Sequence, residues 1–230
     1  MITVEHLTKC YGDFLAVDDL SFEIEEGHVY GFLGPNGAGK STTMNIITGC
    51  LSATSGRVRI DGHDIFEEPG AAKRLIGYLP EQPPLYLNET PVEYLRFVGE
   101  AKGLRGGALE RQIAEVVEQT RLTGVRHRCI SALSKGYRQR VGIAQALLGS
   151  PRVIILDEPT VGLIRQLGQT HTVLFSSHIL SEVQTICDQI LMIAHGKLAA
   201  FGAPDELESR LLTPNEITLT AEGTEEQVRA

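Results

Sequence analysis

The stretch Gly34-Pro35-Asn36-Gly37-Ala38-Gly39-Lys40-Ser41 decides the fold of this chain. It matches the phosphate-loop pattern G-x-x-x-x-G-K-[ST] in full. An apolar run ends just before it at Leu33, and a helical stretch from Thr42 to Cys50 follows it. The pattern requires this strand–loop–helix context, so the sequence predicts a loop that grips phosphate groups at the end of a buried strand.

The residue types in this loop suit a nucleoside triphosphate, which carries several negative charges in a small volume. Gly37 and Gly39 allow the backbone to turn and direct its N–H groups at phosphate oxygens. The helix that starts near Lys40 adds its positive end, and the Lys40 ammonium adds a full charge. Ser41 offers a hydroxyl ligand to Mg²⁺. The predicted ATP-binding residues of this segment are Gly34, Pro35, Asn36, Gly37, Ala38, Gly39, Lys40, Ser41 and Thr42.

Two carboxylates follow a second apolar run, Val153–Leu156. Ligands of α/β sheets lie beyond the carboxyl ends of the strands, so Asp157 and Glu158 should emerge beside the phosphates. Asp157 is predicted to hold Mg²⁺, directly or through water. Glu158 is predicted to orient or deprotonate the attacking water, which is general-base chemistry.

Hydrophobic patterning predicts the architecture around these motifs. Residues 21–25 and 57–61 alternate in the manner of half-exposed antiparallel strands, whereas Val29–Leu33 is continuously apolar and suits a strand covered on both faces. Runs at 173–175 and 190–193 resemble it. The predicted fold class is α/β, with a P-loop NTPase core on a mostly parallel sheet, an antiparallel β edge subdomain and an inserted helical subdomain at about 83–145.

Two helices are predicted within the insertion. Thr90 can cap the first helix, Pro91 suits its first position, and Glu93 can complete a capping box. Glycines between 103 and 107 break the pattern, and a second helix runs to about Leu122.

Composition narrows the function. The 230 residues carry a net charge of −8, which argues against a nucleic-acid partner. One stretch, 121–140, holds six Arg or Lys and no acid, and is either a solvated face or a phosphate-facing surface.

Four scattered cysteines predict neither a disulfide framework nor a zinc site. We find no signal peptide and no apolar run of the ~18 residues that a membrane helix needs, so any membrane role should come through a partner.

Further motifs carry a family resemblance. Residues 133–140 resemble the LSGGQ-type signature of ABC ATPases, and Asp157 follows 23 positions after Ser134. Ser177-His178 resembles the switch histidine of that family, and Tyr11-Gly12 its adenine-stacking aromatic residue. The segments 77–86 and 175–182 are similar to ABC ATPases of the gliding-motility and multidrug-export type. The resemblance covers about residues 1–212, the predicted ABC-type ATP-binding domain.

The resemblance implies a mechanism. Two such domains would close head to tail over two ATP molecules as a homodimer, with Ser134 and Gly136 of one subunit at the γ-phosphate bound by the other. His178 would sense that phosphate, and Tyr11 would stack on adenine. ATP and Mg²⁺ would be the cofactors, and a separate integral membrane permease would be the partner. The chain would then be cytoplasmic and peripheral on the inner face of the cell membrane.

The chain departs from the family pattern in three places. The family usually has Gln where the register places Glu81, with Gln82 next, and either residue could meet the metal. After Leu163 about a dozen residues are absent, including a helix of about three turns; either the protein has lost them or the sequence omits them, and the intact flanks favour the omission. Residues 213–230, with a strand expected at 216–220, resemble the start of a truncated C-terminal extension.

One leading function and two alternatives follow. The first is an ATPase that powers a membrane exporter. The second is an ATP-binding regulatory module with little turnover, which the short segment after Leu163 favours. The third is a soluble ABC ATPase that acts on nucleic acid or the ribosome, which the acidic charge and the single nucleotide-binding domain disfavour.

Overall fold

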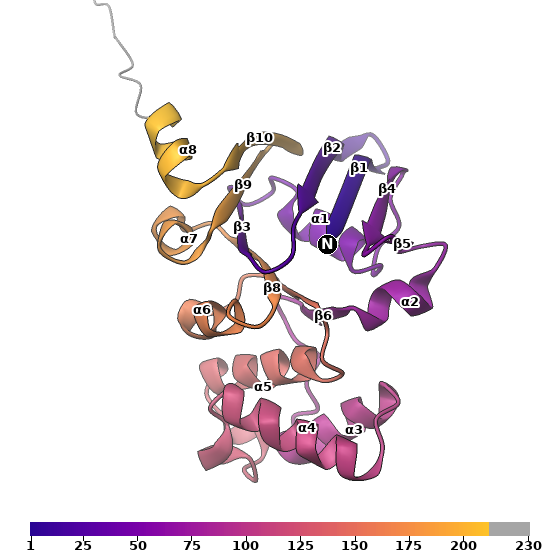
Figure 1. Ribbon diagram of the computed structural model, residues 1–230, viewed down its shortest axis with the longest axis vertical. Coiled ribbons are helices and arrows are strands. Elements are labelled where there is room, and N and C mark those ends of the chain that lie inside the picture. The colour runs from indigo at the N-terminus through magenta and orange to yellow at the C-terminus, as the bar shows by residue number, and fades with distance from the viewer. Residues whose placement is uncertain (212–230) are drawn as a thin grey trace, which may run out of the picture.

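The computed structural model describes residues 1–211, which form two sheets with helices between and around them (Figure 1). The larger sheet has six strands in the order β10-β9-β3-β8-β7-β6, all parallel except β10. Its strands are β3 (Val29–Leu33), β6 (Ile76–Leu79), β7 (Val153–Leu156), β8 (Thr172–Ser177), β9 (Gln189–Ala194) and β10 (Lys197–Gly202). The predicted mostly parallel sheet is confirmed.

The smaller sheet is antiparallel, in the order β2-β1-β4-β5. Its strands are β1 (Ile2–Tyr11), β2 (Phe14–Ile24), β4 (Ser55–Ile60) and β5 (His63–Asp64). The helix α1 (Lys40–Ile47) lies between the two sheets, and α2 (Pro69–Arg74) precedes β6. This sheet is the predicted antiparallel β edge.

The parallel strands bury both faces, as their continuous apolar runs predict. Along β7, Val153 and Ile155 pack with α1 and the small sheet, whereas Ile154 and Leu156 pack with the helices on the other side. On β8, Leu174 packs on the side of α1 and the small sheet, and Phe175 packs on the side of the other helices. Since side chains alternate across a strand, a strand apolar at every position needs a covered surface on each side.

Three helices gather at one end of the molecule (Figure 1). They are α3 (Pro91–Ala101), α4 (Gly106–Gln119) and α5 (Lys135–Leu147), with single 3₁₀ turns at Thr123–Val125 and Ile130–Ala132. The predicted capping box is present: Glu93 Oε2 accepts from Thr90 N–H at 2.9 Å, and Thr90 Oγ1 accepts from Glu93 N–H at 3.3 Å.

The prediction that the second helix reaches Leu122 was wrong by three residues. Arg121 adopts a left-handed conformation with φ 56°. The N–H of Leu122 then bonds the Val117 carbonyl at 2.8 Å, and the N–H of Arg121 bonds that of Glu118 at 2.9 Å. This pair of bonds closes a helix end. Leu122 lies outside the helix, and its side chain is fully buried in the core. Its apolar character therefore reflects core packing and not a position on the helix.

The crossover from β7 to β8 is short. It consists of a 3₁₀ turn at Val161–Leu163 and the single-turn helix α6 (Ile164–Leu167). Ile164 and Leu167 are buried against the sheet. A Cβ at Gly168 would lie 2.3 Å from Cγ2 of Val29, so glycine lets the chain turn directly onto the sheet. One helical turn therefore covers the place where the family pattern has three.

The remaining helices are α7 (Leu180–Ile186) and α8 (Pro204–Leu211). None of the helices within residues 1–211 is long and apolar enough to cross a membrane. The predicted C-terminal extension at 213–230 and its strand at 216–220 lie outside the described residues. The boundaries 1–212 and 83–145 stay predictions.

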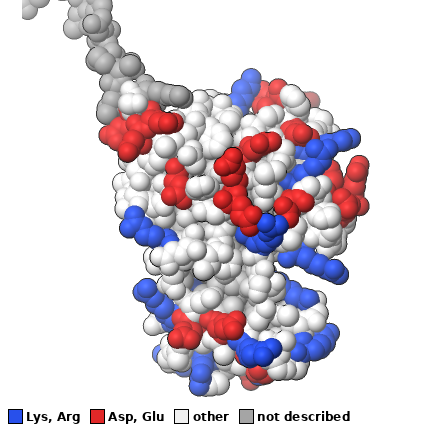
Figure 2. All heavy atoms as spheres, viewed as in Figure 1, with Lys and Arg blue, Asp and Glu red and all other residues white. Residues whose placement is uncertain are grey.

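Figure 2 shows the charge on one face of the molecule. Acidic side chains gather over the part that carries the sheets, and Lys and Arg stand around the helical end with acids between them. On this face the basic residues form no continuous surface of one sign.

Candidate active site

The loop between β3 and α1 owes its shape to glycine at two close approaches. A Cβ at Gly34 would lie 2.3 Å from the carbonyl oxygen of Ile193. Gly39 has φ 103°, and a Cβ there would lie 2.6 Å from the carbonyl oxygen of Ala16. Any other residue would push the loop away from β9 and from the small sheet. The first N–H groups of α1 therefore open directly onto this loop.

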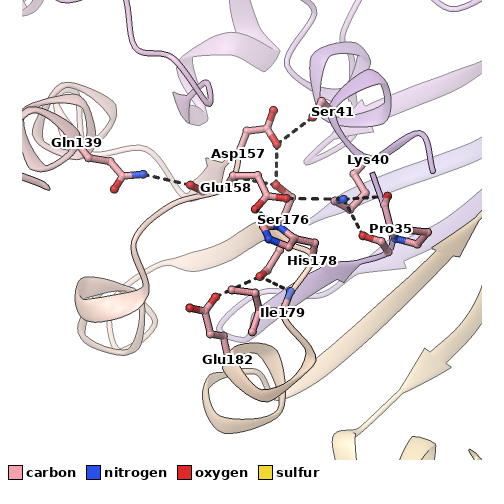
Figure 3. Close-up of polar contacts among 12 residues, drawn as sticks. Pro35, Lys40, Ser41, Gln139, Asp157, Glu158, Ser176, His178, Ile179 and Glu182 are labelled. Carbon is pink, nitrogen blue, oxygen red and sulfur yellow. Dashed lines mark hydrogen bonds and ion pairs between the residues drawn. The ribbon is translucent and has the colours of Figure 1, made fainter. Parts of the chain in front are cut away.

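The Lys40 side chain is only 6% exposed, and its ammonium stands at the mouth of the loop (Figure 3). Nζ donates to the carbonyl oxygens of Gly34 at 2.8 Å and Pro35 at 3.2 Å. It also lies 3.7 Å from Oε1 of Glu158. A full positive charge thus adds to the positive end of α1.

Three oxygen-bearing side chains meet behind the loop (Figure 3). Ser41 Oγ donates to Oδ1 of Asp157 at 3.2 Å, and Ser176 Oγ donates to the same oxygen at 2.6 Å. Asp157 is 3% exposed and Ser176 is fully buried. The hydroxyls fix the direction of the carboxylate and help to stabilise its charge away from solvent.

Glu158 is strained and held from several sides. Its φ is 48°, a left-handed conformation that costs a residue with a Cβ about 1–3 kcal/mol. Its N–H donates to Ser176 Oγ at 2.8 Å, and Oε2 lies 2.9 Å from Nδ1 of His178. The carboxylate is therefore placed between the imidazole and Lys40.

These groups share one cavity of about 920 Å³. It is large enough for a small-molecule ligand or cofactor. Its lining includes the predicted residues Tyr11, Asn36, Gly37, Gly39, Lys40, Ser41, Thr42, Glu81, Gln82, Glu158 and His178. The other predicted residues of the loop, Gly34, Pro35 and Ala38, are not among its lining residues, and neither is Asp157.

The end of the β1–β2 hairpin closes one side of the cavity. Tyr11 pairs with Phe14 across the hairpin, and both side chains line the cavity although they are 49% and 64% exposed. Lys9 Nζ lies 5.2 Å from the centre of the Tyr11 ring. The lysine covers part of that ring, and the two aromatic rings offer flat apolar surface for a base.

Ser134 and Gly136 lie elsewhere, in a separate depression of about 300 Å³. Ser134 caps α5, and its Oγ accepts from the N–H of Tyr137 at 3.4 Å. Thr160 lines both this depression and the large cavity. Ser134 and Gly136 are therefore not among the residues that line the cavity of the phosphate loop in the same chain.

Sequence reasoning missed several lining or supporting residues. Phe14, Lys135 and Gln139 line the cavity, and Ser176 supports both acids. Gln139 lies within the signature stretch, and Ser176 stands two residues before His178, so both were within motifs already noted. Their roles depend on packing that no local pattern reveals.

The oxygen groups around Ser41 fit a magnesium ion. Among the described residues no three His, Cys, Asp or Glu side chains cluster in a manner that could hold a metal. Mg²⁺ needs no such cage, because it keeps several waters and is bound through one or two protein oxygens plus substrate phosphates. Ser41 Oγ and the buried Asp157 carboxylate provide that small set beside the phosphate loop.

Comparison with known proteins agrees with this geometry. A family model described as ABC transporter matches residues 17–161. The linearmycin resistance ATP-binding protein LnrL of Bacillus subtilis (strain 168) is 37% identical, over 98% of this chain and 76% of its own length. That alignment spans 238 positions, so at least eight of them are gaps in this 230-residue chain.

Solved structures share the fold. The structure described as the ATP binding subunit of an ABC transporter has a TM-score of 0.82 and 29% identity, and the match covers 92% of this chain and 93% of that one. The ATP-binding cassette MJ0796, solved as a dimer in a post-hydrolysis state bound to ADP and Pi, has a TM-score of 0.79 and 26% identity over 89% and 99% of the two chains. The chain belongs to the ABC transporter family, as an ATP-binding protein of that family.

Proposed function

We propose that this chain is the ATP-hydrolysing subunit that powers a membrane exporter through nucleotide-driven closure of a dimer. The observation that carries the proposal is the single cavity in which the phosphate loop, Glu158 and His178 meet. A protein that only binds ATP would need the phosphate loop and no carboxylate or imidazole beside it. The carboxylate and imidazole opposite the Lys40 ammonium add the groups that hydrolysis requires.

In this proposal the phosphate loop binds the ATP phosphates, and the acidic residues hold Mg²⁺ and orient the attacking water. Phosphate oxygens accept from the backbone N–H groups at the start of α1 and from Lys40, which turns from its carbonyl partners to the ligand. Ser41 and Asp157 would hold Mg²⁺, with Glu81 or Gln82, which line the same cavity, as a further partner. When bound, the ion neutralises charge on the phosphates.

Glu158 is the group that orients the attacking water in this proposal. Its carboxylate already has His178 on one oxygen and Lys40 near the other. A water that donates to Glu158 is then aimed at the γ-phosphate, the charge of which Lys40 and His178 help to stabilise. Tyr11 stacks on the base at the hairpin end of the cavity.

The position of Ser134 and Gly136 supports a dimer. Their depression opens beside the large cavity but outside it, so they suit the nucleotide of a second subunit better than that of their own. The structural relative MJ0796 is described as dimeric. We infer a homodimer in which each α5 directs its N-terminus at the partner's ATP.

The partner is proposed to be a separate integral membrane permease, with this chain cytoplasmic and peripheral on the inner face of the cell membrane. Three large apolar side chains are exposed in the segment after Gln82 and on α3: Tyr86 is 51% exposed, Leu87 45% and Phe97 51%. The rings of Tyr86 and Phe97 lie 5.2 Å apart. This apolar patch suits an amphipathic segment of the permease. The name of LnrL, a resistance protein, is consistent with export.

ATP turnover by the purified chain tests the proposal. We expect hydrolysis that requires Mg²⁺, and we expect Glu158→Gln to abolish turnover while it retains ATP and accumulates as a dimer in light scattering. Co-purification from membranes with an integral membrane subunit tests the partner, with Phe97→Ser as the variant expected to lose it. An active Glu158→Gln enzyme would contradict the proposed chemistry.

One observation favours a second candidate, an ATP-binding regulator with little turnover. The crossover after Leu163 has the single turn α6 where the family pattern has a helix of about three turns, and the loop that aligns the two sites of the dimer in that pattern is missing. A chain that binds ATP, shows no turnover with Mg²⁺ and forms no dimer as Glu158→Gln would fit this candidate.

A further inference from the structure

Gln139 on α5 bridges two backbone groups beside the acids. Its Nε2 donates to the carbonyl oxygen of Glu158 at 3.2 Å, and its Oε1 accepts from the N–H of Thr160 at 3.0 Å (Figure 3 shows the first contact). Pro159, between them, has no N–H to offer. The amide therefore pairs with the polar backbone groups on both sides of the proline and fixes the path of three successive residues.

The backbone that Gln139 holds is the strained one. Glu158 has φ 48°, and a residue with a Cβ keeps such a conformation only where its surroundings over-determine it. Ser176 on β8 accepts from the Glu158 N–H at 2.8 Å. Gln139 on α5 bonds the carbonyl of the same residue. The peptide groups on the two sides of Glu158 are thus held by two different elements, the sheet and the helix.

We propose that Gln139 is a positioning residue for ATP hydrolysis. Its two hydrogen bonds hold the loop so that the Glu158 carboxylate lies against His178 and near Lys40. This inference rests on the proposed function, because Glu158 must be the group that orients the attacking water. Without the bridge the loop relaxes toward ordinary backbone angles and the carboxylate turns away from its partners.

The helix that carries Gln139 also carries Ser134. Ser134 caps α5, and Gln139 follows five residues later on the same 13-residue helix. Ser134 lines the depression proposed to meet the partner's ATP. A displacement of α5 caused by that contact would reach Glu158 through Gln139, so the bridge couples closure of the dimer to alignment of the carboxylate.

Steady-state ATP hydrolysis by the full chain with Mg²⁺ tests the proposal, with Gln139→Leu as the variant. Leucine has a similar size and no hydrogen-bonding atoms. We expect kcat to fall by about 10²-fold, the cost of a displaced reacting group, with little change in KM for ATP. Gln139→Met, which keeps an unbranched chain, serves the same test if the leucine variant does not fold.

Gln112 provides a matched control on α4. Its Nε2 donates to Ser150 Oγ at 3.1 Å, and its Oε1 accepts from the N–H of Gly149 at 2.9 Å. This is the same kind of two-point bridge, remote from the cavity. Gln112→Leu should lower the thermal midpoint about as much as Gln139→Leu and leave kcat unchanged. Equal losses of kcat in the two variants would overturn the proposal.

A double-mutant cycle separates positioning from other roles. If Gln139 acts through Glu158, adding Gln139→Leu to Glu158→Gln should barely change the residual single-turnover rate. A further loss of similar size to that of Gln139→Leu alone would overturn the inference. Wild-type kcat in Gln139→Leu would do the same while leaving the proposed function intact. Wild-type kcat in Glu158→Gln would instead refute the proposed function.

Discussion

The imidazole Nδ1 of His178 lies 2.9 Å from Oε2 of Glu158, so the two side chains share one hydrogen bond across the cavity. An ionised carboxylate can only accept, so the proton of this bond belongs to Nδ1. The other carboxylate oxygen lies 3.7 Å from Lys40 Nζ. The direction of the Glu158 carboxylate is thus set by two residues from distant segments, His178 just after β8 and Lys40 at the start of α1, and both border the phosphate site.

Replacing His178 by alanine should slow hydrolysis without preventing binding. The imidazole holds Glu158 and is proposed to stabilise charge on the γ-phosphate, and loss of one such group costs about 10²–10³ in kcat. ATP affinity, measured by a fluorescent nucleotide analogue, should change little because the phosphate loop is intact. His127→Ala, an exposed histidine of the helical end, is the control. A normal kcat in His178→Ala would refute this role.

Replacing Lys40 by alanine should weaken nucleotide binding itself. A charge-assisted hydrogen bond contributes about 1.5–3 kcal/mol, which corresponds to a Kd increase of about 10- to 150-fold. Lys73→Ala removes a lysine that, among the described residues, bonds only the carbonyl of Gly49, and it should leave the Kd unchanged. Isothermal titration with ATP measures both. An unchanged Kd in Lys40→Ala would count against the loop as the phosphate site.

The aromatic pair should contribute to ATP affinity through the base alone. Base–aromatic stacking is worth about 1–3 kcal/mol, so Tyr11→Ala and Phe14→Ala should each weaken ATP binding within that range. Inorganic tripolyphosphate has the phosphates and no base, and its Kd should be the same in both variants and the wild type. Equal losses for the two ligands would mean that the hairpin shapes the loop and does not touch the base.

The phosphate loop could be predicted from the sequence because its geometry is local. Lys40 bonds carbonyls five and six residues before it, within one strand–loop–helix unit. Only the close approaches of Gly34 to Ile193 and of Gly39 to Ala16 depend on distant segments. The pair Asp157 and Glu158 was equally accessible, since a strand of apolar residues leads directly to it. Both motifs follow from short runs of sequence and from the rule that ligands of α/β sheets lie beyond the carboxyl ends of the strands.

The supporting contacts could not be predicted because they join distant segments. Gln139 reaches the Glu158 loop only because α5 packs beside β7, and Phe14 meets Tyr11 through a hairpin whose register shifts three times. The end of α4 was misplaced because Arg121, not a glycine, takes the left-handed position. The short crossover was visible as missing residues, but its single turn α6 depends on the contact between Gly168 and Val29.

Thiol chemistry should distinguish Cys187 from Cys50. Burial, and then the neighbouring Asp188, raise the pKa of the Cys187 thiol to about 12. Since the thiolate is the nucleophile, Cys187 should remain unmodified by iodoacetamide at pH 8 in the folded protein. Cys50 is exposed and should react. Peptide mapping by mass spectrometry measures both, and both should react in denaturant. Modification of native Cys187 would mean that α7 opens from the sheet.

Ser176 should matter more for stability than its size suggests. Its Oγ, fully buried, accepts from the Glu158 N–H and donates to Asp157 Oδ1. Alanine would leave the strained Glu158 without its acceptor and Asp157 with one donor fewer. A buried polar group left unpaired costs about 1–3 kcal/mol, and we expect that loss in the free energy of unfolding by urea.

Ser209→Ala is the comparison for Ser176→Ala, because the exposed Ser209 side chain bonds the Glu206 carbonyl of its own helix within the part of the chain that the structure describes, and its loss should cost little. ATP hydrolysis should fall in Ser176→Ala as well, since one hydroxyl aligns both acids. If both serine variants unfolded at the same urea concentration as the wild type, the strained Glu158 backbone would not depend on Ser176. Gln139 would then have to hold it alone, so kcat in Ser176→Ala would stay close to the wild-type value.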